Sequence, residues 1–228
     1  MTEPKPRGRP RREAVQKLRT QVWYLTLLAE AKEGPRALER RFGGSPTSSE
    51  FSKYRLGSVS PTKSVLAKAE IFTAANRCYN HPLWRLLSDG LLSYNELSEA
   101  FDYFNGVKNK SVFLEENKKY GVSWRVDKNL KIQCAAILNI EYGEDVLAAY
   151  LILLEENFLC RRLKQFEQVV KFWKNVRALL MAKEVFCLSS ETALQQGGYK
   201  DSLINVLRQL LQRRWREIVQ EDNCADWW

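Results

Sequence analysis

Histidine is almost absent from this sequence, since His81 is the only one among its 228 residues. No Ser-His-Asp or Cys-His arrangement can be assembled without it, and a lone histidine beside a proline is typical of a structural residue. The chain also lacks a glycine-rich phosphate loop and a GxGxxG motif. We therefore expect no catalytic residues and predict that the protein is not an enzyme.

Cysteine is sparse, and its pattern excludes two kinds of site. The five cysteines are scattered, odd in number and free of any CxxC pair, which is typical of reduced, inert thiols and argues against disulfides and zinc. Three adjacent acidic pairs remain as candidate metal ligands, but neighbouring residues on a helix point about 100° apart. We expect these pairs on solvated faces, and predict no metal and no cofactor: Glu115-Glu116, Glu144-Asp145 and Glu155-Glu156.

Long apolar runs are missing as well. The longest candidate, 146–154, is short and is closed by Glu155 and Glu156, so the sequence predicts no membrane span. The N-terminus is basic and proline-rich, with no apolar stretch typical of a secretory signal. We expect a cytoplasmic protein.

Positive charge is unevenly distributed. Residues 1–70 hold 15 Lys and Arg against 7 Asp and Glu, a balance of +8, whereas residues 71–228 hold 21 against 20, a balance of +1. A local excess of this kind attracts phosphate backbones or anionic lipid heads, although a solvated basic tail is the alternative interpretation.

The spacing of apolar residues predicts an all-α protein with a flexible arm and two domains. Residues 1–12 hold three prolines and no large apolar side chain, so they form the arm. Residues 13–80 are predicted to form a small helical domain, and residues 81–228 a larger helical domain for dimerisation or partner binding. The predicted helices of the small domain are 13–33, 35–42, 49–56 and one from about residue 62 to Ala75.

The larger domain is predicted to open at His81-Pro82. Ser93 and Glu96 form a capping box, in which a serine precedes a glutamate by three residues at the start of a helix. Helical spacing returns from residue 131 to 182 with a break near Gly143, and a last helix is predicted over 201–219. A short strand over 122–126 is possible. Trp227 and Trp228 either pack back onto the body or dock onto a partner.

The basic arm resembles an AT-hook, through Arg7-Gly8-Arg9-Pro10 with further basic residues on both sides. A glycine between two arginines lets an extended backbone lie in a narrow minor groove, where negative potential attracts guanidinium groups. The resemblance implies that Arg7, Arg9 and Arg11 contact the minor groove; an inert tail is the alternative.

Residues 36–70 resemble the helix-turn-helix of the Cro/phage-repressor-like (Xre) family. Leu38, Phe42 and Gly43 match the residues that lead into the recognition helix, and the order of residues 51–54, 57 and 61 matches that helix and its end. The sequence departs from the family in a turn about two residues longer, in Glu39 where a small residue is usual, and in Arg55 where glutamate is usual.

The resemblance implies that residues of the recognition helix meet base edges in the major groove. Ser48 or Ser49 is expected to cap that helix, whose amide groups are then available to a phosphate, while Phe51 and Tyr54 are expected in the core. The predicted DNA-facing residues of this segment are Ser48, Ser49, Ser52, Lys53 and Arg55. Arg36 and Lys63 are expected to contact backbone phosphates, with a solvated surface role as the alternative for either.

Two hypotheses follow for the function. In the first, the protein is a sequence-specific regulator that binds double-stranded DNA, associates with the nucleoid, and forms a homo-oligomer or binds a protein partner through its C-terminal helices. In the second, it is a helical adaptor in a mobile-element or defence assembly, and its basic arm holds DNA or RNA without sequence preference.

Overall fold

A computed structural model describes residues 13–182 and 199–219, apart from 46–47, 94, 98, 101–102, 104–129, 131–133, 135–136, 141, 160 and 162. Within these residues every regular element is an α-helix, which confirms the predicted all-α class. The predicted arm, the possible strand over 122–126 and the tryptophans 227 and 228 lie outside the described residues.

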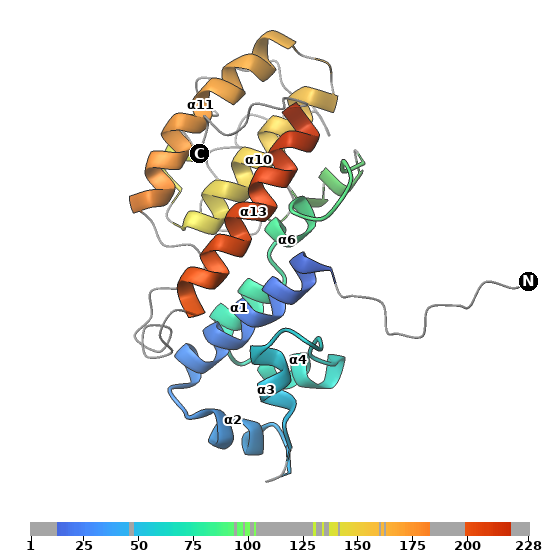
Figure 1. The fold of residues 1–228 in the computed structure, drawn as a ribbon, viewed down its shortest axis with the longest axis vertical. Coiled ribbons are helices and arrows are strands. Elements are labelled where there is room, and N and C mark those ends of the chain that lie inside the picture. The colour runs from blue at the N-terminus through green and yellow to red at the C-terminus, as the bar shows by residue number, and fades with distance from the viewer. Residues whose placement is uncertain are drawn as a thin grey trace, which may run out of the picture.

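Helix α1 (Ala14–Ala31) runs through the middle of the molecule (Figure 1). Its predicted apolar face is buried, but so are all residues from Thr20 to Leu28, because α2, α3, α5, α6 and α13 all contact it. Thr20 and Thr26 are accommodated because each hydroxyl donates to the carbonyl oxygen four residues earlier. One face of α1 was predictable from spacing, whereas the burial of its other faces was not.

Four short helices lie with α1 at one end of the molecule: α2 (Pro35–Arg41), α3 (Glu50–Arg55), α4 (Lys63–Ala69) and α5 (Thr73–Tyr79) (Figure 1). Their core is aromatic. Phe42, Phe51 and Phe72 are buried together with Trp23 and Tyr24 of α1, and several of these rings meet edge to face, the favourable geometry for aromatic pairs.

The prediction of one helix running to Ala75 was wrong, because the chain forms α4 and α5 with a break at 70–72. The reason is a cap supplied from far along the chain. Glu30 of α1 accepts hydrogen bonds from the hydroxyl of Thr73 (3.2 Å) and the amides of Ala74 (2.9 Å) and Ala75 (3.1 Å). A carboxylate at this position satisfies the first amides of a new helix.

The other end of the molecule is built from three long helices, α10 (Gly143–Leu159), α11 (Leu163–Ala182) and α13 (Tyr199–Val219), with the short α6 (Leu83–Leu86) against α10 (Figure 1). The predicted break near Gly143 and the predicted last helix are confirmed. Three buried rings, Tyr150, Trp173 and Trp215, join the long helices, with centroids 5.0–6.0 Å apart. The predicted capping box also forms, since Ser93 and Glu96 exchange hydrogen bonds.

The expectation that the acidic pairs lie on solvated faces was wrong for the two pairs of α10. Glu144, Asp145, Glu155 and Glu156 are all at most 6% exposed. Each end of the helix meets an arginine from elsewhere: Arg214 of α13 lies 2.6 Å from Glu155, and Arg77 of α5 lies 2.7 Å from Asp145. Glu144, Asp145 and Glu155 are tolerated in the interior because a guanidinium group pairs with each of them.

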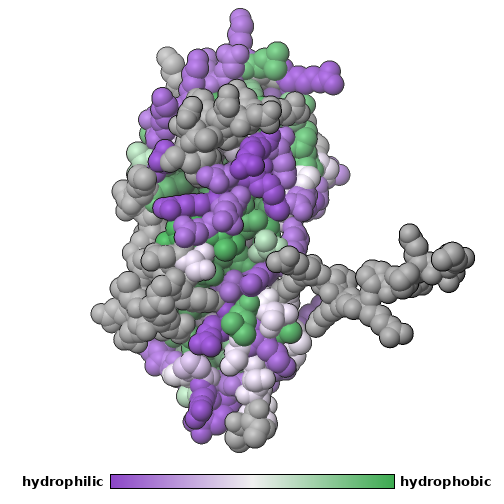
Figure 2. All heavy atoms as spheres, viewed as in Figure 1, coloured by the Kyte–Doolittle hydropathy of each residue, from purple (hydrophilic) through white to green (hydrophobic). Residues whose placement is uncertain are grey.

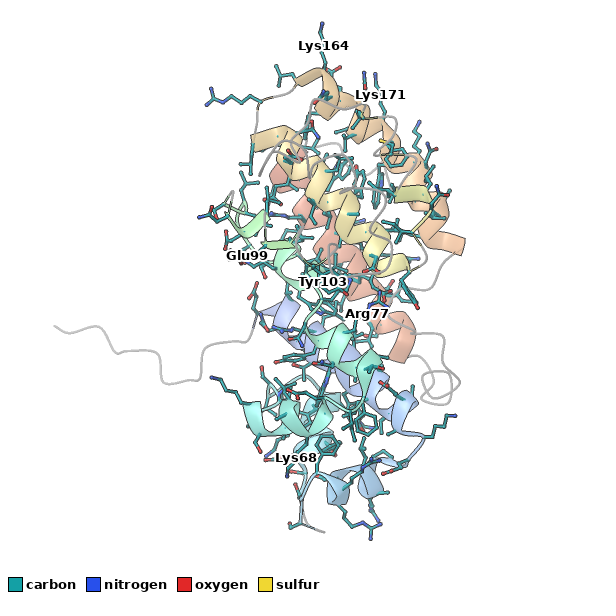
Figure 3. The ribbon with its side chains drawn as sticks, turned by 180° about the vertical axis from the view of Figure 1, so that it is seen from behind. Lys68, Arg77, Glu99, Tyr103, Lys164 and Lys171 are labelled. Carbon is teal, nitrogen blue, oxygen red and sulfur yellow. The ribbon has the colours of Figure 1, made fainter. Side chains whose placement is uncertain are left out.

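The two ends of the molecule meet around His81. This ring is 3% exposed and accepts the amide hydrogen of Leu83 at Nδ1, so its Nε2–H donates to Asp145 at 2.8 Å. Arg77 donates to the same carboxylate and to the hydroxyl of Tyr103. The side chains of Arg77 and Tyr103 lie close together in Figure 3. His81 thus has the buried, hydrogen-bonded position expected of a structural residue. No helix among the described residues is long and apolar enough to cross a membrane.

Candidate nucleic-acid interface

Helix α3, the predicted recognition helix, has two different faces. Phe51 and Tyr54 are 3% and 2% exposed, as expected for core residues. Ser52, Lys53 and Arg55 are exposed. The buried residues lie three apart and the exposed ones occupy the remaining positions, as helical geometry requires of a short surface helix. The three predicted base-contacting side chains of α3 therefore lie on its solvent side.

The buried face of α3 is held against α1. The ring of Tyr54 meets Trp23 at 5.6 Å and that of Phe51 meets Tyr24 at 6.0 Å, and the amide of Gln21 donates to the carbonyl oxygen of Arg55 at 3.2 Å. Burial, assisted by the charge of Glu50, raises the pKa of Tyr54 to about 12. Helix α3 is thus fixed in orientation by side chains of the central helix.

Helix α3 ends in a Schellman motif. The amide of Ser58 bonds the carbonyl oxygen of Lys53 (3.0 Å) and that of Gly57 bonds Tyr54 (2.9 Å), while Gly57 has φ +63°. A Cβ at residue 57 would lie 2.7 Å from the backbone oxygen of Lys17 in α1. Glycine is therefore required at position 57 for two reasons, the left-handed backbone and the close approach of α1.

The start of α3 differs from the expectation. Neither Ser48 nor Ser49 caps the helix by accepting from the amide of its second or third residue. Ser49 makes no side-chain cap, and Ser48 accepts from the amide of Glu50, the first residue of the helix (3.3 Å). Glu39 of α2 accepts from the amide of Phe51 at 3.4 Å instead. A carboxylate at this position occupies an amide that was predicted to be available to a phosphate, and its charge opposes an anion.

Glu39 is one of the residues that depart from the Xre pattern, and its contacts explain how the departure is accommodated. The space beside it is kept open by Gly44, where a Cβ would lie 2.7 Å from the Glu39 side chain. The amide of Phe51, in the first turn of α3, lies within hydrogen-bonding distance of this carboxylate. The sequence shows an unusual residue here, but not its partner.

The turn after α2 is contacted by a basic residue of α4 that the sequence reasoning missed. Leu38 and Phe42 are buried, and Gly43 has φ +84°, in keeping with the roles expected for them. Lys68 of α4 donates from Nζ to the carbonyl oxygen of Phe42 at 2.8 Å. An ammonium group is well placed there, because the C-terminus of a helix carries partial negative charge.

The remaining predicted residues lie on the neighbouring helices. Arg36 is exposed on α2, and Lys63 is exposed as the first residue of α4. Helices α2, α3 and α4 gather at one end of the molecule (Figure 1), and residues 35–70 hold seven Lys and Arg against three Glu, a balance of +4. Arg7, Arg9 and Arg11 lie outside the described residues.

Other chemistry finds little support among the described residues. No group of three or more His, Cys, Asp or Glu side chains in them is arranged to hold a metal ion. Cys78 is buried, and burial raises the pKa of the Cys134 thiol to about 11, which keeps that thiol protonated and weakly reactive near neutral pH.

Comparison with known proteins identifies no relative: no protein-family model, no curated protein and no solved structure matches the chain.

Proposed function

We propose that the protein is a sequence-specific DNA-binding regulator that uses α3 in the major groove of double-stranded DNA. The observation that carries this proposal is the division of α3, which buries Phe51 and Tyr54 against α1 and exposes Ser52, Lys53 and Arg55. Guanidinium, ammonium and hydroxyl groups on such a face are donors that match the acceptors on base edges.

The order of the helices supports the same proposal. The resemblance to the Xre family implies a bundle in which the second and third helices form the helix-turn-helix. Here α2 and α3 contact each other and rest on α1, while α5 closes the bundle by packing on α1. Arg36 and Lys63 flank α3 and would contact phosphates, and the arginines of the N-terminal arm would follow the minor groove.

A second function is favoured by the start of α3. Glu39 and Glu50 place two carboxylates there, and α3 has only six residues, so few side chains reach the bases. This arrangement suits an adaptor that holds DNA or RNA through phosphates alone, within a larger assembly. In both functions the C-terminal helices provide a contact to a second copy or to a protein partner.

The two functions are separated by selection from a random duplex library, with wild type and the double variant Lys53→Ala/Arg55→Ala. A sequence-specific reader enriches a defined motif, and the double variant loses it, because each bidentate base contact contributes about 1–3 kcal/mol of discrimination. The matched control is Arg208→Ala/Arg216→Ala, which removes two exposed cations from α13 and is expected to leave the motif unchanged.

The adaptor predicts a different result. Wild type and both variants would then bind every duplex weakly and alike, and binding would vanish as salt is raised. The absence of any enriched motif would overturn the proposal of a sequence-specific regulator.

A further inference from the structure

Helix α11 presents a row of polar side chains to solvent at the end of the molecule opposite α3. Lys164, Gln168 and Lys171 are exposed, as is Asn175 one turn further on. Residues four, seven and eleven positions apart lie on the same face of a helix. Figure 3 shows Lys164 and Lys171 extending away from the helical bundle, and hydrophilic side chains project from this end in Figure 2 as well.

The charge of this segment differs from that of its surroundings. Residues 161–178 hold six Lys and Arg against a single acid, Glu167, a balance of +5. Residues 71–228 as a whole have a balance of only +1, with 21 Lys and Arg against 20 Asp and Glu, so the rest of that region is net acidic. Among the residues that the structure describes, Lys164 and Lys171 make no ion pair within 4 Å. Glu167 is exposed within one turn of both lysines, but it is the only acid of this segment, so the surface stays net positive.

The side chains of the row indicate which kind of ligand it binds. Lys164 and Lys171 are about 10 Å apart along the helix axis at 1.5 Å per residue, and a duplex carries about one negative charge per 1.7 Å of its axis. Gln168 and Asn175 lie in the same row and add amide donors, which commonly bond phosphate oxygens. The row itself holds no large apolar side chain. Leu163 beside it is 73% exposed, but a helix that binds a membrane surface needs a whole apolar face and not a single residue.

We propose that this row of α11, formed by Lys164, Gln168, Lys171 and Asn175, is a second DNA-binding surface that holds the phosphate backbone of a duplex. It lies at the opposite end of the long axis from α3 (Figure 1), so one molecule can hold two segments of DNA at once. The inference rests on the proposed function only in taking duplex DNA as the ligand, because α11 reads no bases.

Photo-crosslinking in the full-length chain tests this surface. The crosslinking amino acid p-benzoylphenylalanine is introduced at Gln168 and, as the control, at Gln209. Gln209 is likewise an exposed glutamine of a long helix, α13, but Asn205 lies four residues before it, and Arg213, four residues after it, pairs with Asp89. With a random-sequence duplex of about 30 base pairs at low salt, we expect crosslinks from position 168 at least tenfold above those from position 209. The change Lys164→Glu/Lys171→Glu should remove that excess.

A second readout distinguishes this proposal from that of the reading helix. In a Lys53→Ala/Arg55→Ala background the crosslink from position 168 should persist, even where the selected motif is lost. Bridging of two fluorescent duplexes should fall with Lys164→Ala/Lys171→Ala, and the slope of log K against log salt for the second duplex should be shallower by about 1.8, since each phosphate contact contributes about 0.9. Three outcomes would overturn the second surface and leave the first proposal intact. The first is equal crosslinking at positions 168 and 209, and the second is crosslinking that survives the charge reversal. The third is crosslinking to single-stranded RNA or to an acidic protein but not to the duplex.

Discussion

Gly57 is the residue on which the position of the candidate recognition helix depends most directly. Its backbone closes the Schellman motif of α3, and its missing Cβ allows that motif to contact α1 at the oxygen of Lys17. The sequence alone predicted that a helix ends at this glycine. The contact with α1 is a tertiary feature, since Lys17 and Gly57 are 40 positions apart.

Changing Gly57→Ala should lower the free energy of unfolding by about 3 kcal/mol, because a left-handed alanine costs about 1–2 kcal/mol and the Cβ collides with backbone as well. Gly90→Ala is the matched control. Gly90 has φ +83°, but a Cβ there meets nothing within 4 Å, so only the left-handed strain remains, about 1 kcal/mol. Urea unfolding followed by circular dichroism measures both variants. Equal losses would show that the approach of α1 contributes nothing.

Among the helices, α5 shows how one element depends on another for its start. Its first amides have no capping side chain of their own, since Phe72 occupies the cap position. Glu30, at the far end of α1, bonds two of these amides. The same device recurs between Glu39 and α3. Sequence reasoning looks for caps among adjacent residues, so it extended one helix through the break and assigned the cap of α3 to a serine.

Substituting Glu30→Ala should destabilise the protein by about 1 kcal/mol, the usual value of a lost helix cap. Glu33→Ala is the control from the same part of the chain, because within the described part of the chain Glu33 pairs only with Arg41, whose side chain is 45% exposed, and such pairs contribute less than about 0.5 kcal/mol. Thermal unfolding and hydrogen exchange of the amides of Ala74 and Ala75 report the difference. The role of Glu30 as a cap would be refuted by unchanged exchange at those two amides.

For the whole molecule, the connection between the two ends passes through a few charged groups. Arg77 and His81 both bond Asp145, and α1 also contacts α13. The predicted boundary at His81-Pro82 falls within this cluster. Two surfaces that are proposed to hold DNA therefore lie at the ends of a body joined by buried polar contacts.

Replacing Asp145→Asn should lower the free energy of unfolding by about 2 kcal/mol, because Arg77 loses the nearer of its two carboxylate partners and keeps only Glu144, at 3.3 Å. Asp89→Asn is the control: the Asp89 side chain is 67% exposed and pairs with Arg213, so its loss should be below about 1 kcal/mol. Chemical denaturation measures both values, with hydrogen exchange in α5 and α10 as a second readout. A loss no greater than that of Asp89→Asn would mean that the junction is held by apolar contacts alone.

The sequence by itself determined most of the helices, several of their ends and the uneven charge. These features depend on residues within about four positions of one another: the apolar spacing of α1, the capping box at Ser93 and Glu96, and the glycine after α3. Local geometry couples such residues directly, so a single sequence reveals them.

Tertiary structure alone decided which groups are buried and what satisfies them. Glu155 pairs with Arg214, Asp145 with Arg77, and Glu39 with the start of α3. Acidic pairs on a helix are solvated when one face is free and buried when neighbours surround the helix, and α10 is of the second kind. A chain position does not specify its distant partner, because that partner is selected by the packing of whole helices against one another.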